Sequence, residues 1–369
     1  MLTARRPGGL LTGRWAIVAP IRNDHWECGV DERLAGINRW LTEELGFGEF
    51  HIAPASADAS FRRYFRVTRE GQSLIVMDAP PDKENTGPFR TVAKAMFDIG
   101  LNVPEIIEAD VGNGYLLLGD LGTQTYLPNL NTQSVDGLYG DALNALITLQ
   151  GKIAADAPFL PPYDHKLLMF EMSLFKDWFL GRHLGVELDA AQTDAWNAVC
   201  ATLAASALEQ PKVAVHRDYH SRNLMITAVN NPGIIDFQDA VAGPITYDLV
   251  SLLRDCYIAW PRARVETWAQ GYRRRAVDAG LLHAETVDAA TWLRWFDLMG
   301  VQRHLKAIGI FARLNHRDGK PGYLGDIPRT LGYVIDVCSR YPQLAGLAAI
   351  VETLVVQRVV PEFAGERGG

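Results

Sequence analysis

Three oxygen-bearing side chains stand at a spacing that suits chemistry on phosphate. The stretch AVHRDYHSRNLMI (214–226) places Asp218 five residues before Asn223, and IIDFQD (234–239) adds Asp236. Mg²⁺ prefers hard oxygen ligands, takes few of them from the protein and completes its shell with water and phosphate oxygens. A carboxylate beside such a metal ion can accept the proton of an attacking hydroxyl. The set is therefore suited to phosphoryl transfer, which needs positioning and charge neutralisation above all.

Two short strand-like runs bracket this polar loop and predict how it is held. KVAV (212–215) precedes the loop, LMI (224–226) follows it, and TAVNNPG (227–233) has the composition of a turn before II (234–235). A hairpin between the last two strands would return Asp236 to the side of Asn223. The loop would then hold Asp218 at the mouth of the same site.

The chain before the loop divides into two parts of different character. An amphipathic helix is predicted over 31–46, followed by a small sheet with one internal helix over 46–118. The strands are 60–68, 73–81 and 114–122, and the helix is 89–100. From about residue 120 helices predominate, with Ser134 as the expected N-cap of the first. Their predicted ranges are 134–154, 166–180, 193–210, 247–256, 262–279, 285–315 and 326–339. The fold class is therefore α+β.

Composition excludes several classes of protein. The formal net charge of −7 and the absence of a Lys/Arg block argue against a nucleic-acid partner. No apolar run reaches the roughly 20 residues that span a bilayer. Arg14 interrupts the apolar part of the N-terminal stretch, which disfavours a signal peptide and leaves residues 1–30 as an extension. Four scattered cysteines without a CxxC pair indicate reduced thiols, so we expect a cytoplasmic protein with no obligate protein partner.

The motifs resemble those of a known family. HRDYHSRN followed by IIDFQD is similar to the catalytic and metal loops of the protein-kinase-like fold. AGPITYDLVSLL (242–253) looks like the continuation found in the aminoglycoside phosphotransferase and choline kinase branch. Within that branch, DASFRRYFRV, VMDAPP and FARLNHRDGK resemble the bacterial N-acetylmuramate/N-acetylglucosamine anomeric kinases of cell-wall recycling. The resemblance covers roughly residues 35 to 340.

The resemblance implies a bilobal architecture and roles for the loop residues. It implies a small β-rich N-lobe over 31–118 that binds the nucleotide, and a larger, mostly helical C-lobe over 119–369 that carries catalysis and sugar binding. Asp218 would be the catalytic base, and Asn223 and Asp236 the metal ligands. His216 and Asp248 would fix the loop from behind. The cofactors implied are Mg²⁺ and, as co-substrate, ATP, although GTP stays open.

The nucleotide site is expected where the two lobes join. The backbone of LLLGDLG (116–122) near Gly119 and Leu121 would meet the adenine, with Ile75 of the strand 73–81 beside it. The small residues of ASADAS (55–60), ending at Ser60, would let backbone N–H groups approach the phosphates.

One departure from the kinase pattern leaves a charge to be supplied. Met77 stands where the phosphate-pairing Lys belongs, and the helix 89–100 lacks the Glu that would orient it. Arg62, Arg63 and Arg66 are the nearest cations. We favour Arg62 or Arg63, because each lies beside the small-residue loop.

For the acceptor, the resemblance implies an amino sugar phosphorylated at its anomeric hydroxyl. His220, Arg254 and Trp260 are the expected substrate residues, with His220 or Arg254 offsetting a carboxylate on the sugar and Trp260 stacking on its ring. Two other functions stay open: an antibiotic-inactivating aminoglycoside kinase, and an inactive nucleotide-binding scaffold, which Met77 alone supports.

Overall fold

The computed structural model describes residues 31–57 and 61–356 of the 369-residue chain. They belong to two compact units, residues 1–49 and 50–369. The described part of the first unit is helix α1 (Glu32–Arg39), which continues as the π-helical turn η1 (Trp40–Glu44). The Asp31 carboxylate caps α1 by accepting a hydrogen bond of 3.0 Å from the backbone N–H of Leu34. The helix predicted over 31–46 is thus confirmed, whereas the proposed extension 1–30 lies outside the described residues.

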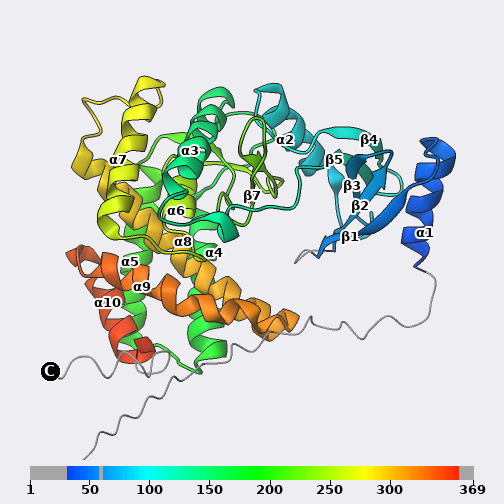
Figure 1. The fold of residues 1–369 in the computed structure, drawn as a ribbon. Helices are drawn as coiled ribbons and strands as arrows, with labels where there is room; N and C mark the ends of the chain where they lie inside the picture. The colour runs from blue at the N-terminus through cyan, green and yellow to red at the C-terminus, as the bar shows by residue number, and fades with distance from the viewer. Residues whose placement is uncertain (1–30, 58–60, 357–369) are drawn as a thin grey trace, which may run out of the picture. The chain divides into compact units, whose positions relative to one another are not determined.

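The second unit begins with a five-stranded antiparallel sheet in the order β1-β2-β3-β5-β4 (Figure 1). Its strands are β1 (His51–Ala57), β2 (Arg63–Arg69), β3 (Gln72–Asp78), β4 (Ile106–Asp110) and β5 (Tyr115–Gly119). The side chains of β2 alternate as the sequence predicts: Phe65 and Val67 are buried, while Tyr64 and Arg66 remain partly exposed. Glu70 and Gly71, both with positive φ, form the two-residue turn between β2 and β3.

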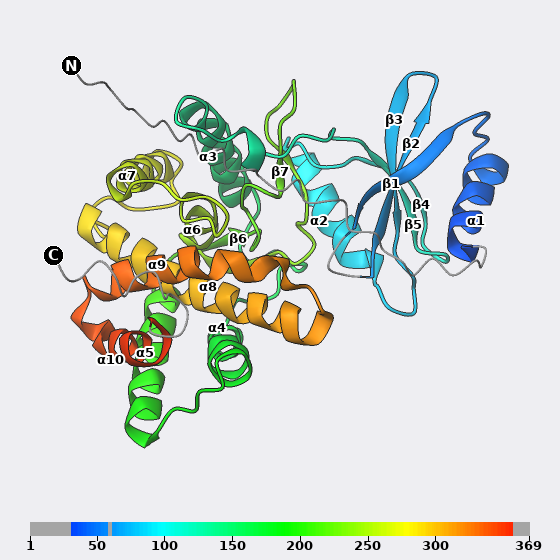
Figure 2. The same ribbon diagram turned by 60° about the horizontal axis from the view of Figure 1, so that its bottom comes forward.

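Helix α2 (Thr86–Asp98) connects β3 to β4 and lies between the sheet and the helical part in both views (Figures 1 and 2). The Asn85 side chain caps it by accepting a 2.8 Å hydrogen bond from the N–H of Gly87. Its buried face has the helical spacing of an amphipathic segment and consists of Phe89, Val92, Ala93 and Met96. The helix predicted over 89–100 is therefore confirmed, with an earlier start.

The remainder of the unit is mostly helical. Its α-helices are α3 (Val135–Lys152), α4 (His165–Leu174), α5 (Ala190–Leu208), α6 (Tyr247–Leu253), α7 (Arg262–Asp278), α8 (Ala289–Asp318), α9 (Ile327–Cys338) and α10 (Ala345–Ile350). The π-helical turns η3 (Phe175–His183) and η6 (Val351–Val356) extend α4 and α10, and short 3₁₀ turns cover Leu127–Asn129, Pro321–Asp326 and Pro342–Leu344. Each predicted helix is found here, but α10 was not predicted.

The start of α3 differs from its prediction in detail. Ser134 occupies the N-cap position, yet its hydroxyl makes no cap bond. It donates instead to the carbonyl of Asn129 at 2.7 Å. The carboxamide oxygen of Asn131 accepts from the N–H groups of Gln133 and Ser134, so a turn before the helix satisfies these donors.

Two small antiparallel ladders interrupt the helices and frame the polar loop. Strand β6 (Lys212–Val215) pairs with β9 (Val241–Pro244), and β7 (Leu224–Met225) pairs with β8 (Gly233–Ile234). Leu224 lies opposite Ile234, and the N–H of Ile235 donates to the carbonyl of Asn223 at 3.1 Å. The predicted hairpin is therefore confirmed, and it brings Asp236 back beside Asn223. Among the helices of the described segments, none is long and apolar enough to cross a membrane.

Candidate active site

The catalytic loop, residues 216–223 between β6 and β7, brings the three predicted side chains together. The Asn223 amide nitrogen donates to the backbone carbonyl of Asp218 at 3.0 Å and to the Asp236 carboxylate at 3.2 Å. Both bonds use the nitrogen, so the carboxamide oxygen is the atom of Asn223 that can bind a cation. Asp236 has a left-handed backbone (φ +65°) and accepts a second bond of 2.8 Å from Gln238. The loop thus places one amide oxygen and two carboxylates in one site.

Buried acids hold this loop from behind. Asp248, the second residue of α6, accepts hydrogen bonds from the N–H groups of His216 at 2.6 Å and Arg217 at 3.0 Å. The His216 ring donates through Nε2 to the carbonyl of Ile235 at 3.1 Å, which ties the loop to β8. Both residues therefore lie where the sequence predicts, behind the loop. Asp255, which the sequence reading missed, accepts from the N–H of Ser221 at 3.0 Å and from its hydroxyl at 2.5 Å.

The surroundings of Asp218 keep its carboxylate ionised. Burial alone would raise the pKa, but the positive charge of Lys306 and of neighbouring groups such as Arg303 outweighs it and lowers the pKa to about 2. Burial also lowers the pKa of His216 to about 4, so that ring is neutral at physiological pH. Asp218 is thus available as a proton acceptor, and His216 is confined to hydrogen bonding.

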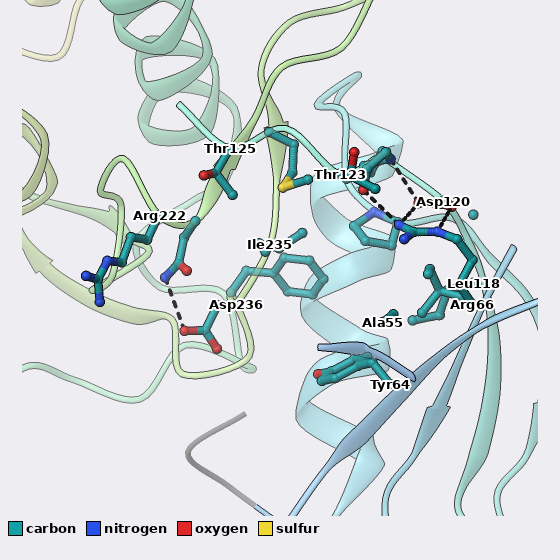
Figure 3. Close-up of a pocket in the computed structure, with 18 of the residues that line it drawn as sticks. Ala55, Tyr64, Arg66, Leu118, Asp120, Thr123, Thr125, Arg222, Ile235 and Asp236 are labelled. Atoms are coloured by element: carbon teal, nitrogen blue, oxygen red, sulfur yellow. Dashed lines mark hydrogen bonds and ion pairs between the residues drawn. The ribbon is translucent and has the colours of Figure 1, made fainter. Parts of the chain in front are cut away.

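A cavity of about 430 Å³ opens between the sheet and the catalytic loop. Figure 3 shows Tyr64, Arg66 and Leu118 on its sheet side and Arg222 and Asp236 on its loop side. Ile75, Gly119 and Leu121, the predicted nucleotide residues, line it as well. The cavity therefore has apolar residues such as Ile75 and Leu118 at one end, and Asn223 and Asp236 at the other.

The arginines near this cavity are distributed differently from our expectation. Arg66 lines it and forms a bidentate ion pair with Asp120, with N–O distances of 2.6 and 3.0 Å. Arg63, one of the two residues we favour, donates through Nε and Nη2 to one oxygen, Oδ2, of the buried Asp78 carboxylate, at 2.9 and 2.6 Å. Arg62 lies 4.0 Å from Glu84. Neither Arg62 nor Arg63 lines the cavity, and Ser60 lies outside the described residues.

Met77 has an apolar environment in place of the kinase ion pair. Its side chain is fully buried and belongs to the same core cluster as Phe89 and Met96 of α2. The ring of Phe89 packs against Phe237, the residue after Asp236, with centroids 4.9 Å apart. Apolar contact between α2 and the metal loop therefore replaces the Lys–Glu pair.

A second cavity of about 280 Å³ adjoins the first on the far side of Asp236. Arg222, Asn223 and Asp236 line both cavities. The second contains Asp218 and His220 and is closed by one face of α8. The remaining residues that line it are Tyr247, Cys256, Tyr257, Arg303, Lys306, Ala307, Ile310, Phe311, Leu314 and Tyr323.

Of the three predicted substrate residues, the structure brings only His220 into this cavity. Arg254 follows α6, and its guanidinium is buried against α9, where it pairs with Asp336 at 3.0 Å and stacks over the Tyr333 ring at 5.0 Å. The indole of Trp260 donates to the Tyr139 hydroxyl at 3.1 Å. Both side chains thus stabilise packing between helices, although they follow the catalytic loop closely in sequence.

The sequence reading missed the cations of the second cavity. Arg303 and Lys306 lie one turn apart on α8, and the apolar lining residues Ala307, Ile310 and Leu314 follow them on the same face. The available signal was the pair of basic residues inside the otherwise apolar run LMGVQRHLKAIGIF (298–311). A buried helix that carries charges needs a partner for them.

A fold with a five-stranded sheet above a helical body, and an Asp–Asn–Asp site between two cavities, defines a kinase of the protein-kinase-like class. The chain matches the phosphotransferase enzyme family over residues 51–285 and belongs to that family. It is 48% identical over 335 residues to an N-acetylmuramate/N-acetylglucosamine kinase of Pseudomonas putida, which covers 88% of this chain and 97% of that protein. A protein of the same name from Neisseria meningitidis is 44% identical, with 88% and 96% covered.

Solved structures support the fold. A choline kinase from Streptococcus pneumoniae superposes with a TM-score of 0.56 at 12% identity, covering 82% of this chain and 99% of that one. The ADP-bound aminoglycoside phosphotransferase APH(2'')-Ib gives 0.56 at 14% identity, covering 82% and 98%. The predicted family and fold are confirmed, and the protein is a phosphotransferase. The exact division into lobes at residue 118, which falls inside the second compact unit, stays a prediction.

Proposed function

We propose that this phosphotransferase transfers the γ-phosphoryl group of ATP to the anomeric hydroxyl of N-acetylmuramate and N-acetylglucosamine. One observation carries the proposal: three relatives that bear these sugars in their names are 44–48% identical to this chain over 96–97% of their own length. The reaction would yield a sugar 1-phosphate. Three cysteines of the protein, Cys200, Cys256 and Cys338, are buried and free, which fits a cytoplasmic enzyme of cell-wall recycling.

We assign the cavity of about 430 Å³ to the nucleotide and the cavity of about 280 Å³ to the sugar. Asp236 and Asn223 border both, so the γ-phosphoryl group would sit beside them. Arg222 borders both as well and is exposed, which makes it a candidate for the phosphate charge that Met77 cannot supply. Arg66 is already paired with Asp120 and is the weaker candidate.

The donor set suits Mg²⁺, although it is small. Within the described residues there is no cluster of three or more His, Cys, Asp and Glu side chains that could hold a metal ion. An amide oxygen and a carboxylate nevertheless match the oxygen preference of Mg²⁺, which commonly takes one or two protein ligands and completes its shell with phosphate oxygens and water. Asn223 and Asp236 would hold the ion. When bound, it would neutralise charge on the β- and γ-phosphates.

Asp218 would act on the sugar. As the anomeric oxygen forms its bond to the γ-phosphorus, the bond from that phosphorus to the bridging oxygen of ADP breaks, and the hydroxyl proton passes to the Asp218 carboxylate. An anomeric hydroxyl is more acidic than an ordinary alcohol, which favours this proton transfer. Asp248 and Asp255 would position the carboxylate through the loop backbone, because their four hydrogen bonds fix both ends of residues 216–221.

The second candidate, an aminoglycoside kinase, fits the acceptor cavity poorly. Aminoglycosides are polycations, whereas the cations Arg222, Arg303 and Lys306 line the same cavity as Asp218. Bringing like charges together in a partly buried site is unfavourable. The fold likeness to aminoglycoside phosphotransferases therefore does not extend to the chemistry of this cavity.

The test is a transfer assay with ATP and N-acetylmuramate, N-acetylglucosamine, kanamycin and the 1-O-methyl glycoside of N-acetylglucosamine. We expect both free sugars to be phosphorylated, with the phosphorus coupled to the anomeric carbon in NMR spectra of the product. A 6-phosphate product, or turnover of the methyl glycoside or of kanamycin, would reject the assignment.

A further inference from the structure

Arg303 of α8 is a buried cation whose charge lacks a matched partner. Arg303 is 5% exposed, and it lines the cavity that we assign to the sugar. Its one hydrogen bond is a 3.7 Å contact with the sulfur of Cys256, and its Nε atom is buried without a bond. Among the described residues, no carboxylate lies within ion-pair distance of its guanidinium. Asp218 and Asp255 act on Arg303 only over a longer range.

The neighbouring cations are already satisfied. Lys306 lies 3.1 Å from the carboxylate of Glu171 and donates to the Tyr247 hydroxyl at 2.9 Å. Arg222 is exposed, and its guanidinium stacks on the Tyr257 ring at 3.6 Å. Among the three, Arg303 combines deep burial with the lack of a carboxylate at ion-pair distance in the described residues. Burying an unpaired guanidinium is costly, so the site is suited to an anion that enters the cavity.

The chemistry of the guanidinium indicates which anion fits. Its planar fork donates two parallel hydrogen bonds to a carboxylate, a geometry that a single ammonium cannot match. Of the two proposed acceptors, N-acetylmuramate carries a lactyl carboxylate and N-acetylglucosamine is neutral. The other anion in reach would be the γ-phosphoryl group, but the proposed assignment of the cavities puts that group beside Asn223 and Asp236, where Arg222 borders both cavities.

We infer that Arg303 is the specificity residue that binds the carboxylate of the acid sugar, an inference that rests on the proposed function. It replaces Arg254 in this role, since Arg254 is paired with Asp336 outside the cavity. The contact would form in the ground state and in the transition state alike. It would therefore act mainly on KM for the acid sugar and affect turnover of the neutral sugar much less.

The experiment measures kcat/KM for both sugars in the wild type, in Arg303→Gln and in Arg303→Lys. For N-acetylmuramate, we expect Arg303→Gln to lower kcat/KM about 10²-fold, mostly through KM, and Arg303→Lys to retain part of the activity. For N-acetylglucosamine, which lacks the carboxylate, the loss should be at least about tenfold smaller, because only the effect of Arg303 on the nearby Asp218 carboxylate would remain. Arg264→Gln is the matched control, because Arg264 pairs with Asp136 outside both cavities.

A wild-type comparison keeps the test decisive if a variant fails to fold. The carboxamide of N-acetylmuramate has the size of the acid but no charge. For the wild type, kcat/KM with the carboxamide should therefore be lower than with the acid by about tenfold or more. Equal use of acid and carboxamide, or an equal loss of both sugars in Arg303→Gln, would overturn the inference while leaving the kinase function intact. A wild type that phosphorylates neither sugar would overturn both the inference and the proposed function.

Discussion

The chemistry proposed for this enzyme depends on a few side chains within one loop and one hairpin. Asp218 faces the acceptor cavity with its carboxylate ionised, while Asn223 and Asp236 share a hydrogen bond across the hairpin. The loop leaves Asp218 as the one carboxylate that lines the acceptor cavity but not the nucleotide cavity. The proposed base therefore lines one cavity only, whereas the proposed metal ligands Asn223 and Asp236 line both.

Replacing the proposed base gives the first prediction. In Asp218→Asn the acceptor proton loses its carboxylate, so kcat should fall about 10²–10⁴-fold, the usual contribution of a general base. Nucleotide affinity, measured by calorimetry, should persist because Asn223 and Asp236 are untouched. Asp239→Asn, an exposed acid nearby, is the control and should keep wild-type activity. A loss in Asp218→Asn below about tenfold would contradict the role of base.

The pKa of Asp218 gives the second prediction, a flat acid side of the pH profile. Because nearby positive charge holds this pKa at about 2 against the opposing effect of burial, the carboxylate stays ionised over the accessible range. The kcat/KM for N-acetylglucosamine should therefore show no acid limb from this group between about pH 5 and pH 9. An acid limb near pH 6 that disappears in the residual activity of Asp218→Asn would show that the pKa is not lowered.

At the scale of elements, α8 carries Arg303 and Lys306, the cations of the proposed acceptor cavity, and passes close to the backbone of another helix. Gly309 permits this approach. A Cβ atom at residue 309 would lie 2.3 Å from the carbonyl carbon and 2.5 Å from the carbonyl oxygen of Leu174, where α4 meets η3. Those neighbours are main-chain atoms and cannot swing aside as a flexible side chain could. The position of Arg303 and Lys306 relative to the catalytic loop thus depends on a glycine one turn further along α8.

A pair of alanine variants tests this contact. Gly309→Ala should destabilise the protein by about 1–3 kcal/mol, as overpacking of a tight interface does. Gly332→Ala, in α9, has open space at its Cβ position and should be neutral or stabilising by about 0.5–1 kcal/mol. Denaturant unfolding of both variants measures the difference. Equal stability of the two would mean that α8 and η3 are farther apart than the structure has them.

At the scale of the whole molecule, the two cavities meet at Asn223 and Asp236, so nucleotide and metal should stabilise the enzyme together. A ligand at about 100 times its Kd adds about 2.7 kcal/mol to the free energy of unfolding. ATP with Mg²⁺ should therefore raise the melting temperature by about 5 °C, more than ATP alone.

The Asp236→Ala variant isolates the metal contribution. It should lose the additional rise that Mg²⁺ gives, because the ion would lose its charged protein ligand. Asp239→Ala removes an exposed acid three residues away and should behave as the wild type. Thermal shift measurements with ATP, with and without Mg²⁺, provide a readout independent of catalysis. An intact Mg²⁺ effect in Asp236→Ala would remove this residue from the metal site.

The sequence by itself determined the catalytic loop and most of the helices. Asp218, Asn223 and Asp236 are joined by one short hairpin, so their proximity follows from local strand and turn patterns. The edge strands β1 and β4 were not predicted, because their local sequence lacks the pattern of a buried strand. Pro54 interrupts the first, and most residues of the second are exposed, so neither has the apolar alternation of a buried strand.

Only the tertiary structure decided which cations line the proposed acceptor cavity. Arg254 and Trp260 follow the catalytic loop closely in sequence, yet the first is buried against α9 and the second against α3. Arg303 and Lys306 lie far along the chain and enter the cavity because α8 packs across the helical body. Helical periodicity identifies a buried face but not the element that the face meets. That choice depends on how the helices pack, which is set by contacts between residues distant in sequence.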